Sequence, residues 1–330
     1  MQKYKAAVIG LGQAGSRFDE EPRGCVWSHV GAYIALKERY ELVGGVDVDQ
    51  KNLDAFAKRC PSVPRYSSVS ELMENGHPDV VSLATPSNIR IEAVDELLKK
   101  CPPRLIICEK PLATDISSRQ RLVDECKNKN VVLLVHYNRR YSPVYQTLLK
   151  TIREGVVGDV SSITVRCPNR LWSIGSHAFD LLFYLSGESP LSWRAIPLPS
   201  LEEGGEPAVD FIGYFPSGHV GRVSIQGKKN ILIFEVDVIG TKGRLTVTNN
   251  GEKMVHIPFK RSQQYKGYWV QGRARGFPDI PQTHSTFIAI ANEAADILDN
   301  GLRPTCTGEM ALQSEAILDQ LNFKAKEMHE

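Results

Sequence analysis

The first 137 residues alternate short apolar runs with segments of helical periodicity. The apolar runs lie at residues 6–9, 41–46, 79–84, 105–108 and 131–135. Such uninterrupted runs are typical of strands that are buried on both faces of a sheet. Between them, residues 88–100 and 115–129 carry apolar side chains at helical spacing. The alternation predicts an α/β domain over residues 1–137, with a doubly wound parallel sheet and helices on both of its faces.

After about residue 159 the pattern changes to longer strand-like segments that are joined by glycine-containing turns. Two hairpins are predicted, the first pairing residues 210–215 with 219–226 and the second pairing 231–239 with 244–248. Helices over residues 285–300, ended by Gly301, and over 309–326 close the chain. The pattern therefore predicts a second, α+β domain over residues 138–330.

Composition and charge exclude several classes of protein. The chain has 330 residues, and its 40 Lys and Arg against 38 Asp and Glu give a formal net charge of +2. Without a basic excess we expect neither nucleic acid nor a membrane as a partner. No segment reaches the ~18 consecutive apolar residues of a membrane span, and the first apolar run is too short for a signal peptide. The seven cysteines include no Cys-x-x-Cys pair, which favours reduced thiols and a cytoplasmic location.

A glycine motif, Gly10-Leu11-Gly12-Gln13-Ala14-Gly15, directly follows the first apolar run. The pattern G-x-G-x-x-G alone is weak, because glycines recur in ordinary turns. Between a strand and a helix, however, it exposes backbone N–H groups that can bind a pyrophosphate. Its position after a predicted strand, with a helix able to begin behind it, therefore predicts a dinucleotide-binding loop.

Asp47 ends the second apolar run. A carboxylate at that place can accept hydrogen bonds from a ribose 2′-hydroxyl and repel a 2′-phosphate, which favours NAD over NADP. Asp47 follows Gly15 at a longer interval than the usual ~20 residues, so we expect residues 18–28 to loop out. The alternative is a solvated strand-end carboxylate, with Asp49 capping the next helix.

The segment Cys108-Glu109-Lys110-Pro111-Leu112 places a lysine at the carboxyl end of a predicted parallel strand, where open α/β sheets bind ligands. Together with the glycine motif and Asp47, it resembles the glucose–fructose oxidoreductase and inositol dehydrogenase family (Gfo/Idh/MocA), of which Glu-Lys-Pro is the hallmark. The resemblance continues along most of the chain, through Thr85-Pro86, residues 138–143, residues 155–160 and Gly175-Ser176-His177-Ala178-Phe179-Asp180.

The resemblance implies a fold and an activity. The fold is a Rossmann domain at residues 1–137, followed by an α+β domain with a large, mostly antiparallel open sheet that binds substrate and oligomerises. The activity is that of an NAD(P)-dependent oxidoreductase. It transfers hydride between nicotinamide and a secondary hydroxyl or ketone of a sugar, nucleotide-sugar or cyclitol. A homodimer or homotetramer is implied, and we expect no metal.

Two residues carry the chemistry in this resemblance. Lys110 is implied beside the nicotinamide and the reacting hydroxyl, where its charge stabilises a developing alkoxide. His177 is implied as the general acid/base, because the unperturbed pKa of imidazole lies near neutral pH. The implied cofactor contacts are Gly10, Gly12, Gln13, Ala14, Gly15, Asp47, Thr85, Pro86, Glu109, Lys110 and Asn138. The candidate substrate contacts are Arg140, Tyr141, Trp172, Ser173, Asp180 and His284.

Three positions leave alternatives open. Ser173 stands where active members of the family commonly carry an aspartate, so either Lys110 and His177 act without it or the substrate geometry differs. Asp180 lies three residues after His177 and either orients the imidazole or holds its helix in place. Arg90 replaces a frequent histidine, and a solvated guanidinium on the face of a helix is favoured over one that approaches a phosphate or carboxylate.

Because Ser173 stands where active members of the family carry an aspartate, a second class of function stays an alternative. The same fold can bind a dinucleotide without catalysis and regulate a partner protein, and some members of the family do so. The presence of Lys110 and His177 disfavours such a regulatory role, because a sensor requires neither residue. Reduction of a non-sugar ring substrate is a third alternative.

Overall fold

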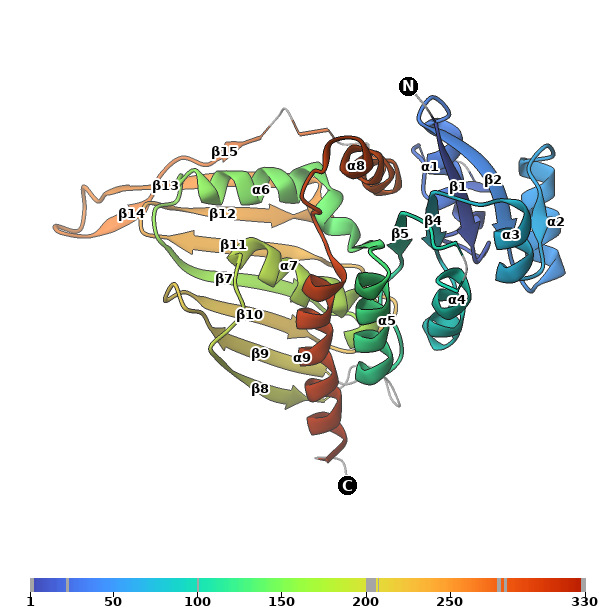
Figure 1. Ribbon diagram of the computed structural model, residues 1–330. Coiled ribbons are helices and arrows are strands. Elements are labelled where there is room, and N and C mark those ends of the chain that lie inside the picture. Colours follow the sequence, from blue (N-terminus) through green and yellow to red (C-terminus); the bar gives the residue numbers. More distant parts are fainter. Residues whose placement is uncertain are drawn as a thin grey trace. The chain divides into compact units, whose positions relative to one another are not determined.

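A computed structural model describes residues 3–21, 24–99, 101–199, 206, 208–277, 280–281 and 284–327. Its contacts divide the chain into two compact units (Figure 1). Unit 1 comprises residues 1–141 and 283–312, and unit 2 comprises residues 142–282 and 313–330. The sequence predicts a division after residue 137, whereas the contacts divide the chain after Tyr141 and assign residues 283–312 to unit 1.

Unit 1 is built on a six-stranded sheet in the order β3-β2-β1-β4-β5-β6, and every neighbouring pair is parallel. Its strands are β1 (Tyr4–Ile9), β2 (Tyr40–Val46), β3 (Arg65–Tyr66), β4 (Val80–Leu83), β5 (Leu105–Cys108) and β6 (Val132–Val135). The predicted strands are confirmed, and the sequence missed only β3, whose two residues are too few to form a pattern. This order is that of the dinucleotide-binding fold, with a switch point between β1 and β4.

Helices enclose this sheet in unit 1. They are η1 (Arg17–Asp19), α1 (His29–Ala35), α2 (Gln50–Arg59), α3 (Val69–Asn75), η2 (Ser87–Ile89), α4 (Arg90–Leu97), α5 (Ile116–Asn128), η3 (Asn138–Tyr141) and α8 (Thr286–Asn300). Alternate residues of β1 face opposite cores: Ala6 and Val8 join one apolar cluster, and Ala7 and Ile9 join the other. The continuous apolar runs of the sequence therefore reflect burial on both faces.

Helix α8 explains why residues 283–312 belong with unit 1. Its apolar side chains, Phe287 and Ile290 among them, pack into the same cluster as Val8 and Val30. The hydroxyl of Tyr40, on β2, donates to the carbonyl of Ala291 at 2.5 Å. Burial of the apolar stripe of α8 thus outweighs its distance along the chain.

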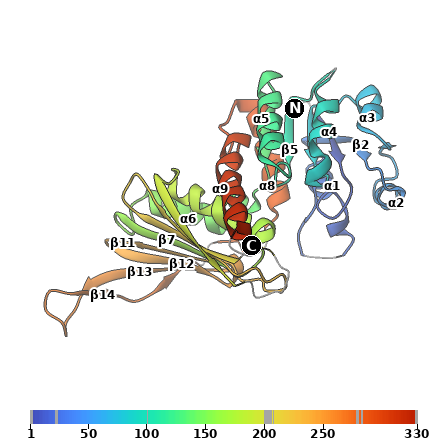
Figure 2. The same ribbon diagram turned by 90° about the horizontal axis from the view of Figure 1, so that it is seen from below.

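Unit 2 is built on a nine-stranded sheet in the order β14-β13-β12-β11-β7-β10-β9-β8, with β15 paired to β13. The strands are β7 (Val160–Cys167), β8 (Ser192–Leu198), β9 (Ala208–Tyr214), β10 (Val220–Ile225), β11 (Glu235–Gly240), β12 (Gly243–Thr248), β13 (Lys253–Arg261), β14 (Trp269–Gln271) and β15 (Arg275–Gly276). The pair of β7 and β10 is parallel and the other pairs are antiparallel. The large, mostly antiparallel sheet is therefore confirmed, and Figure 2 shows its strands as one twisted layer.

The remaining helical segments are α6 (Pro143–Arg153), the π-helical turn η4 (Leu171–Gly175), α7 (Ser176–Ser186), η5 (Asn249–Gly251) and α9 (Gly308–Glu327), which begins in unit 1. Leu148 of α6 and Leu182 of α7 share an apolar cluster with strand residues such as Val165 and Val238. Along β12, buried and half-buried residues alternate strictly. Burial along β12 thus follows the two-residue period of a strand whose two faces differ in exposure.

Both predicted hairpins are confirmed, with one correction to a boundary. The second hairpin begins at Glu235 and not at Ile231, because residues 231–234 form no strand. The side chain of Asn169 donates to the carbonyls of Lys229 and Ile231 and holds this segment as a loop. In the described part of the chain, no helix is long and apolar enough to cross a membrane.

Candidate active site

The glycine motif forms a tight loop after β1. Gly10 has a φ of +89°, and a Cβ at this position would lie 2.7 Å from the backbone of Ala84 and Thr85. A Cβ at Gly15 would lie 1.8 Å from the carbonyl oxygen of Gly10. A Cβ at Gly12, by contrast, would meet no atom within 4 Å. The glycines at the two ends of the motif are required by packing, whereas the middle one borders open space, as expected where a backbone must approach a pyrophosphate closely.

Residues 16–28 stand in the sequence between the glycine motif and α1, the helix that follows it. The N–H groups of His29 and Val30 donate to the carbonyls of Ala14 and Gly15, so α1 continues a turn that begins in the motif. The described residues between them, 16–21 and 24–28, form turns, bends and η1, in agreement with the loop predicted from the long interval to Asp47. The expected helix directly behind Gly15 is replaced by a turn and η1, because the insertion interrupts it.

Asp47 lies half-buried at the end of β2 and supports the glycine loop. Its Oδ2 accepts hydrogen bonds from the N–H of Leu11 at 2.7 Å and from the side chain of Asn52 at 3.0 Å. Its Oδ1 accepts one from the N–H of Asp49 at 2.8 Å, and Asp49 caps α2 as predicted. A carboxylate has about four acceptor positions, so these contacts leave capacity for a ribose hydroxyl.

Three neighbouring strands end in polar residues at the carboxyl edge of the sheet in unit 1. Thr85 and Pro86 follow β4, Glu109 and Lys110 follow β5, and Asn138 begins η3 beyond β6. Thr85 is buried, and its hydroxyl forms no hydrogen bond with any residue that the structure describes. Lys110 and Asn138 are half-buried and Pro86 is exposed. The edge thus carries both charged and uncharged polar groups where a ligand of this fold binds.

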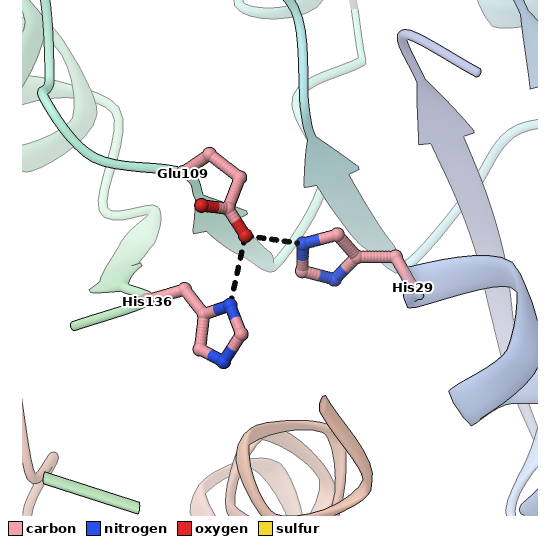
Figure 3. A group of neighbouring side chains, drawn as sticks. All are labelled: His29, Glu109 and His136. Atoms are coloured by element: carbon pink, nitrogen blue, oxygen red, sulfur yellow. Dashed lines mark hydrogen bonds and ion pairs between the residues drawn. The ribbon is translucent and has the colours of Figure 1, made fainter. Parts of the chain in front are cut away.

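The carboxylate of Glu109 lies between two buried imidazoles (Figure 3). Nδ1 of His136 donates to Oε1 of Glu109 at 2.8 Å, and Nε2 of His29 donates to the same oxygen at 3.2 Å. The ring of Phe287, on α8, contacts both imidazoles edge-on, with centroids 4.5 and 5.0 Å away. Glu109 is therefore held rigidly, one residue before Lys110.

Burial and hydrogen bonding pull the charges of this cluster in opposite directions. Burial alone would raise the pKa of Glu109, but the two imidazoles, His136 first, hold that pKa well below its ordinary value. Burial lowers the pKa of His29, and the bond to Glu109 only partly opposes this shift. Near neutral pH the cluster therefore contains an ionised carboxylate and an uncharged His29.

His29, Glu109 and His136 form a group whose potential ligand atoms lie within 4.8 Å of one another. Zinc accepts such a donor set. The separations of 2.8 and 3.2 Å, however, are those of ordinary hydrogen bonds, which account for the arrangement without a cation. The absence of a metal stays a prediction.

Arg90 is buried, with 3% of its surface exposed, so the prediction of a solvated arginine is wrong. Its Nη1 donates to the carbonyl of Glu109 at 2.6 Å and also to that of Pro111, and its Nη2 donates to the carbonyl of Thr85. The reason is local: α4 begins beside two strand ends whose carbonyl groups need donors. Helical periodicity does not reveal such a contact.

The candidate substrate residues of unit 1 make contacts within that unit. Arg140 has 4% of its surface exposed, and its Nη1 donates to the carbonyl of Thr305 at 3.0 Å. Tyr141 is buried, and its carbonyl accepts a hydrogen bond from Nε2 of His284 at 2.8 Å. These contacts hold η3 in place, and a substrate role for Arg140, Tyr141 and His284 stays a prediction.

In unit 2, a single π-helical turn precedes α7. The N–H of Gly175 donates to the carbonyl of Arg170 at 2.9 Å, across five residues. Ser173 is exposed on this turn. Trp172 is half-buried, and its backbone N–H donates to the carboxylate of Glu206 at 2.7 Å. Single π turns inside helices occur frequently at functional sites.

His177 and Asp180 lie in the first turns of α7, as predicted. Both are buried, with 8% and 1% of their surfaces exposed. Their spacing of three residues on a regular helix sets them on one face. Both roles considered for Asp180, holding the helix and orienting the imidazole, agree with this placement.

Sequence reasoning missed His29, His136 and the burial of Arg90. One signal was available for His136, which directly follows the apolar run of β6, just as Glu109 follows that of β5. The rule that carboxyl strand ends supply functional groups would have found it. No signal marks His29, because the insertion before α1 hides its proximity to the sheet edge.

Residues 4–137 match the sequence profile of a family described as "Oxidoreductase family, NAD-binding Rossmann fold". The matched stretch contains the glycine motif, Asp47 and the Glu-Lys-Pro segment. The match assigns residues 4–137 to the Gfo/Idh/MocA oxidoreductase family, and relatives over more of the chain are named MocA and myo-inositol 2-dehydrogenase. The predicted family, the class of enzyme and the NAD-binding fold are thereby confirmed.

Two relatives illustrate the degree of similarity. An uncharacterised oxidoreductase of Schizosaccharomyces pombe is 28% identical over 72% of this chain, and the match spans 58% of that protein, less than two thirds of its length. Myo-inositol 2-dehydrogenase of Thermotoga maritima is 24% identical, over 80% of this chain and 81% of its own.

Solved structures agree in fold over almost the whole chain. WlbA dehydrogenase of Bordetella pertussis, crystallised with NADH and UDP-GlcNAcA, has a TM-score of 0.75 at 20% identity and covers 98% of this chain and 96% of its own. A super-repressor mutant of Gal80p from Saccharomyces cerevisiae has a TM-score of 0.77 at 13% identity, covering 100% and 97%. At such identities the similarity shows the fold alone.

Proposed function

We propose that this Gfo/Idh/MocA member is an NAD-dependent dehydrogenase of polyhydroxylated rings. Its substrate is a secondary alcohol, or the corresponding ketone, of a sugar, nucleotide-sugar or cyclitol. When bound, the nicotinamide supplies the hydride acceptor or donor. The names of the relatives, myo-inositol 2-dehydrogenase among them, support this substrate class.

The observation that carries the proposal is the position of Lys110. It stands at the carboxyl end of β5, one strand from the switch point of the sheet, in the unit that also contains the open glycine loop. A half-buried ammonium at that edge stabilises an alkoxide more strongly than a solvated one, because water screens it less.

His177 is the proposed proton acceptor in alcohol oxidation and the donor in ketone reduction. An imidazole can serve in both directions near neutral pH. Asp180, on the same face of α7, is the proposed orienting group for the imidazole. Lys110 and His177 belong to different units, and the proposal requires both to reach one carbinol carbon.

Asp47 supports NAD over NADP. Its carboxylate is already fixed by the N–H of Leu11 and by Asn52, and it retains acceptor capacity for the ribose. A 2′-phosphate near this fixed negative charge would be repelled.

The test is turnover of NAD by the purified chain with a panel containing myo-inositol, glucose and UDP-N-acetylglucosamine, followed by NADH absorbance. We expect reduction of NAD with at least one cyclitol or sugar, and its loss in Lys110→Met. Turnover that survives in Lys110→Met would contradict the proposed role of the lysine.

A regulatory, non-catalytic function is the second candidate, and Ser173 is the observation that favours it. A serine supplies no charge where active members carry an aspartate, and the fold is shared with the Gal80p super-repressor mutant. This candidate predicts that NADH binds and quenches tryptophan fluorescence while no member of the panel is oxidised or reduced.

A further inference from the structure

We propose that Arg90 is a positioning residue that holds the backbone on both sides of Lys110. The inference rests on the proposed function, because it concerns the group that acts on the substrate. Arg90 does not itself reach a ligand: its side chain is buried and its donors are directed at carbonyl groups.

Arg90 contacts the backbone on both sides of Lys110. One nitrogen, Nη1 of Arg90, donates both to the carbonyl of Glu109, at 2.6 Å, and to the carbonyl of Pro111. These are the residues immediately before and after the lysine. A single planar guanidinium therefore restrains the path of the chain through Lys110, as its rigid fork of donors allows.

Arg90 also contacts a segment that packs on the glycine loop. Nη2 of Arg90 donates to the carbonyl of Thr85, beyond the end of β4. A Cβ at Gly10 would lie 2.7 Å from the backbone N of Thr85, so the segment that contains Thr85 packs directly on the glycine loop. Arg90 thus ties the segment that carries Lys110 to the segment that lies against the proposed cofactor site.

The charge of the buried Arg90 side chain also bears on its role. Among the residues that the structure describes, no carboxylate forms an ion pair with Arg90, and its Nε has no hydrogen-bond partner. A buried, uncompensated charge is costly, and an apolar side chain of similar volume often serves stability at least as well. The guanidinium is explained better by the geometry that it imposes on the strand ends than by a contribution to stability.

Arg119 offers a matched control in the same unit. It is also buried, with 1% of its surface exposed, and it also donates to backbone carbonyls, namely those of Ala113 and Thr114. These two acceptors lie further along the same segment and are not the residues on either side of Lys110. Replacement of either arginine removes a buried guanidinium, and of the carbonyl contacts named here only those of Arg90 are made to Glu109 and Pro111.

The experiment compares Arg90→Met and Arg119→Met in the full chain, with brief acetylation by acetic anhydride and quantification of acetyl-Lys110 by peptide mass spectrometry. Lys150, whose side chain is 76% exposed, serves as the internal standard. We expect a severalfold change in the ratio of Lys110 to Lys150 labelling in Arg90→Met only. With a substrate from the panel, we expect kcat of Arg90→Met to fall roughly 10- to 100-fold, with a smaller change in KM, because reacting groups are misplaced.

A labelling ratio in Arg90→Met equal to that of the wild type, or altered equally in Arg119→Met, overturns the proposal. If Arg90→Met does not fold, Arg90→Lys replaces it, because lysine keeps the charge but cannot hold three carbonyls in one plane; the same labelling comparison then decides. If no substrate is turned over by the wild type, the proposed function fails, whereas the labelling ratio still reports on Arg90.

Discussion

The two units deliver their candidate catalytic groups in different ways. In unit 1, the sheet is parallel and buried on both faces, so its polar chemistry gathers at the carboxyl ends of the strands, where Glu109 and Lys110 stand. In unit 2, the sheet is mostly antiparallel, and the candidate group, His177, lies on a helix that follows a π-helical turn.

This difference separates two ways of fixing a functional side chain. At the edge in unit 1, neighbouring residues from distant parts of the chain hold the site: His29, Arg90 and His136 all bond to Glu109. In unit 2, His177 stands in the first turn of α7, directly after the π-helical turn, and is buried. Substitution of Glu109, which several distant residues hold, should therefore affect stability as well as catalysis.

The largest expected effect is at Lys110. Lys110→Met keeps the length and apolar stem of the side chain but removes the charge, so kcat should fall by roughly two to four orders of magnitude while NADH affinity changes little. Steady-state kinetics and NADH fluorescence titration measure the two quantities. A parallel loss of affinity would show that Lys110 binds the cofactor more than it assists the chemistry.

His177→Ala is the corresponding change in unit 2. We expect a similar loss in kcat, of roughly two to four orders of magnitude, since the proton acceptor is removed. Ser192→Ala, at an exposed position of β8 in the same unit, is the control and should stay within about threefold of wild type, because it lies outside the candidate site. Unchanged turnover in His177→Ala would contradict the proposed role of His177, and the catalytic groups would then have to come from unit 1.

Glu109→Ala tests the hydrogen-bonded cluster. It leaves the N–H donors of two buried imidazoles without their acceptor, so the free energy of unfolding should fall by about 2–4 kcal/mol, measured by urea denaturation. Glu71→Ala, at an exposed carboxylate that accepts from Ser67, should cost about 1 kcal/mol or less. A wild-type Tm that falls on addition of EDTA would indicate a bound cation in place of the hydrogen bonds.

Asp47→Ser should shift cofactor preference. Loss of the carboxylate removes the repulsion of a 2′-phosphate, so kcat/KM for NADP relative to NAD should rise roughly tenfold, about 1.4 kcal/mol. Asp49→Ser removes a charge two residues away while keeping a residue that caps α2 well, and should leave the ratio unchanged. An unaltered ratio in Asp47→Ser would mean that the aspartate only supports the glycine loop.

The smallest effect concerns pH and His29. Because burial lowers the pKa of His29, the unfolded chain binds a proton more readily, and stability should fall as pH decreases through the ordinary range of histidine. His29→Gln keeps a donor for Glu109 but does not titrate, so its Tm should fall less between pH 7 and pH 5. His219 and His256, whose pKa values burial also lowers, are present in both proteins and cancel in the difference. Equal falls in Tm would place the pH dependence elsewhere.

Much of the site could be read from the sequence because it follows rules of local spacing. The glycine motif, Asp47 and the Glu-Lys-Pro segment each stand next to a continuous apolar run, and parallel strands bring the ends of such runs to one edge. The looping out of the residues before α1 followed from a simple excess of chain length. The two residues of β3 and the interrupted helix behind Gly15 did not follow, because neither leaves a periodic pattern.

The sequence by itself determined most strands of unit 1, the parallel nature of its sheet and the identity of the residues at its strand ends, because burial on both faces leaves a continuous apolar signature. Only the tertiary structure decided which side chains meet at that edge. The bonds of Glu109 to His29 and His136, and the burial of Arg90 against three carbonyls, join residues that no spacing rule connects. The physical reason is that buried carbonyls and carboxylates must find donors wherever the folded chain provides them, and that supply is a property of the packing rather than of the local pattern.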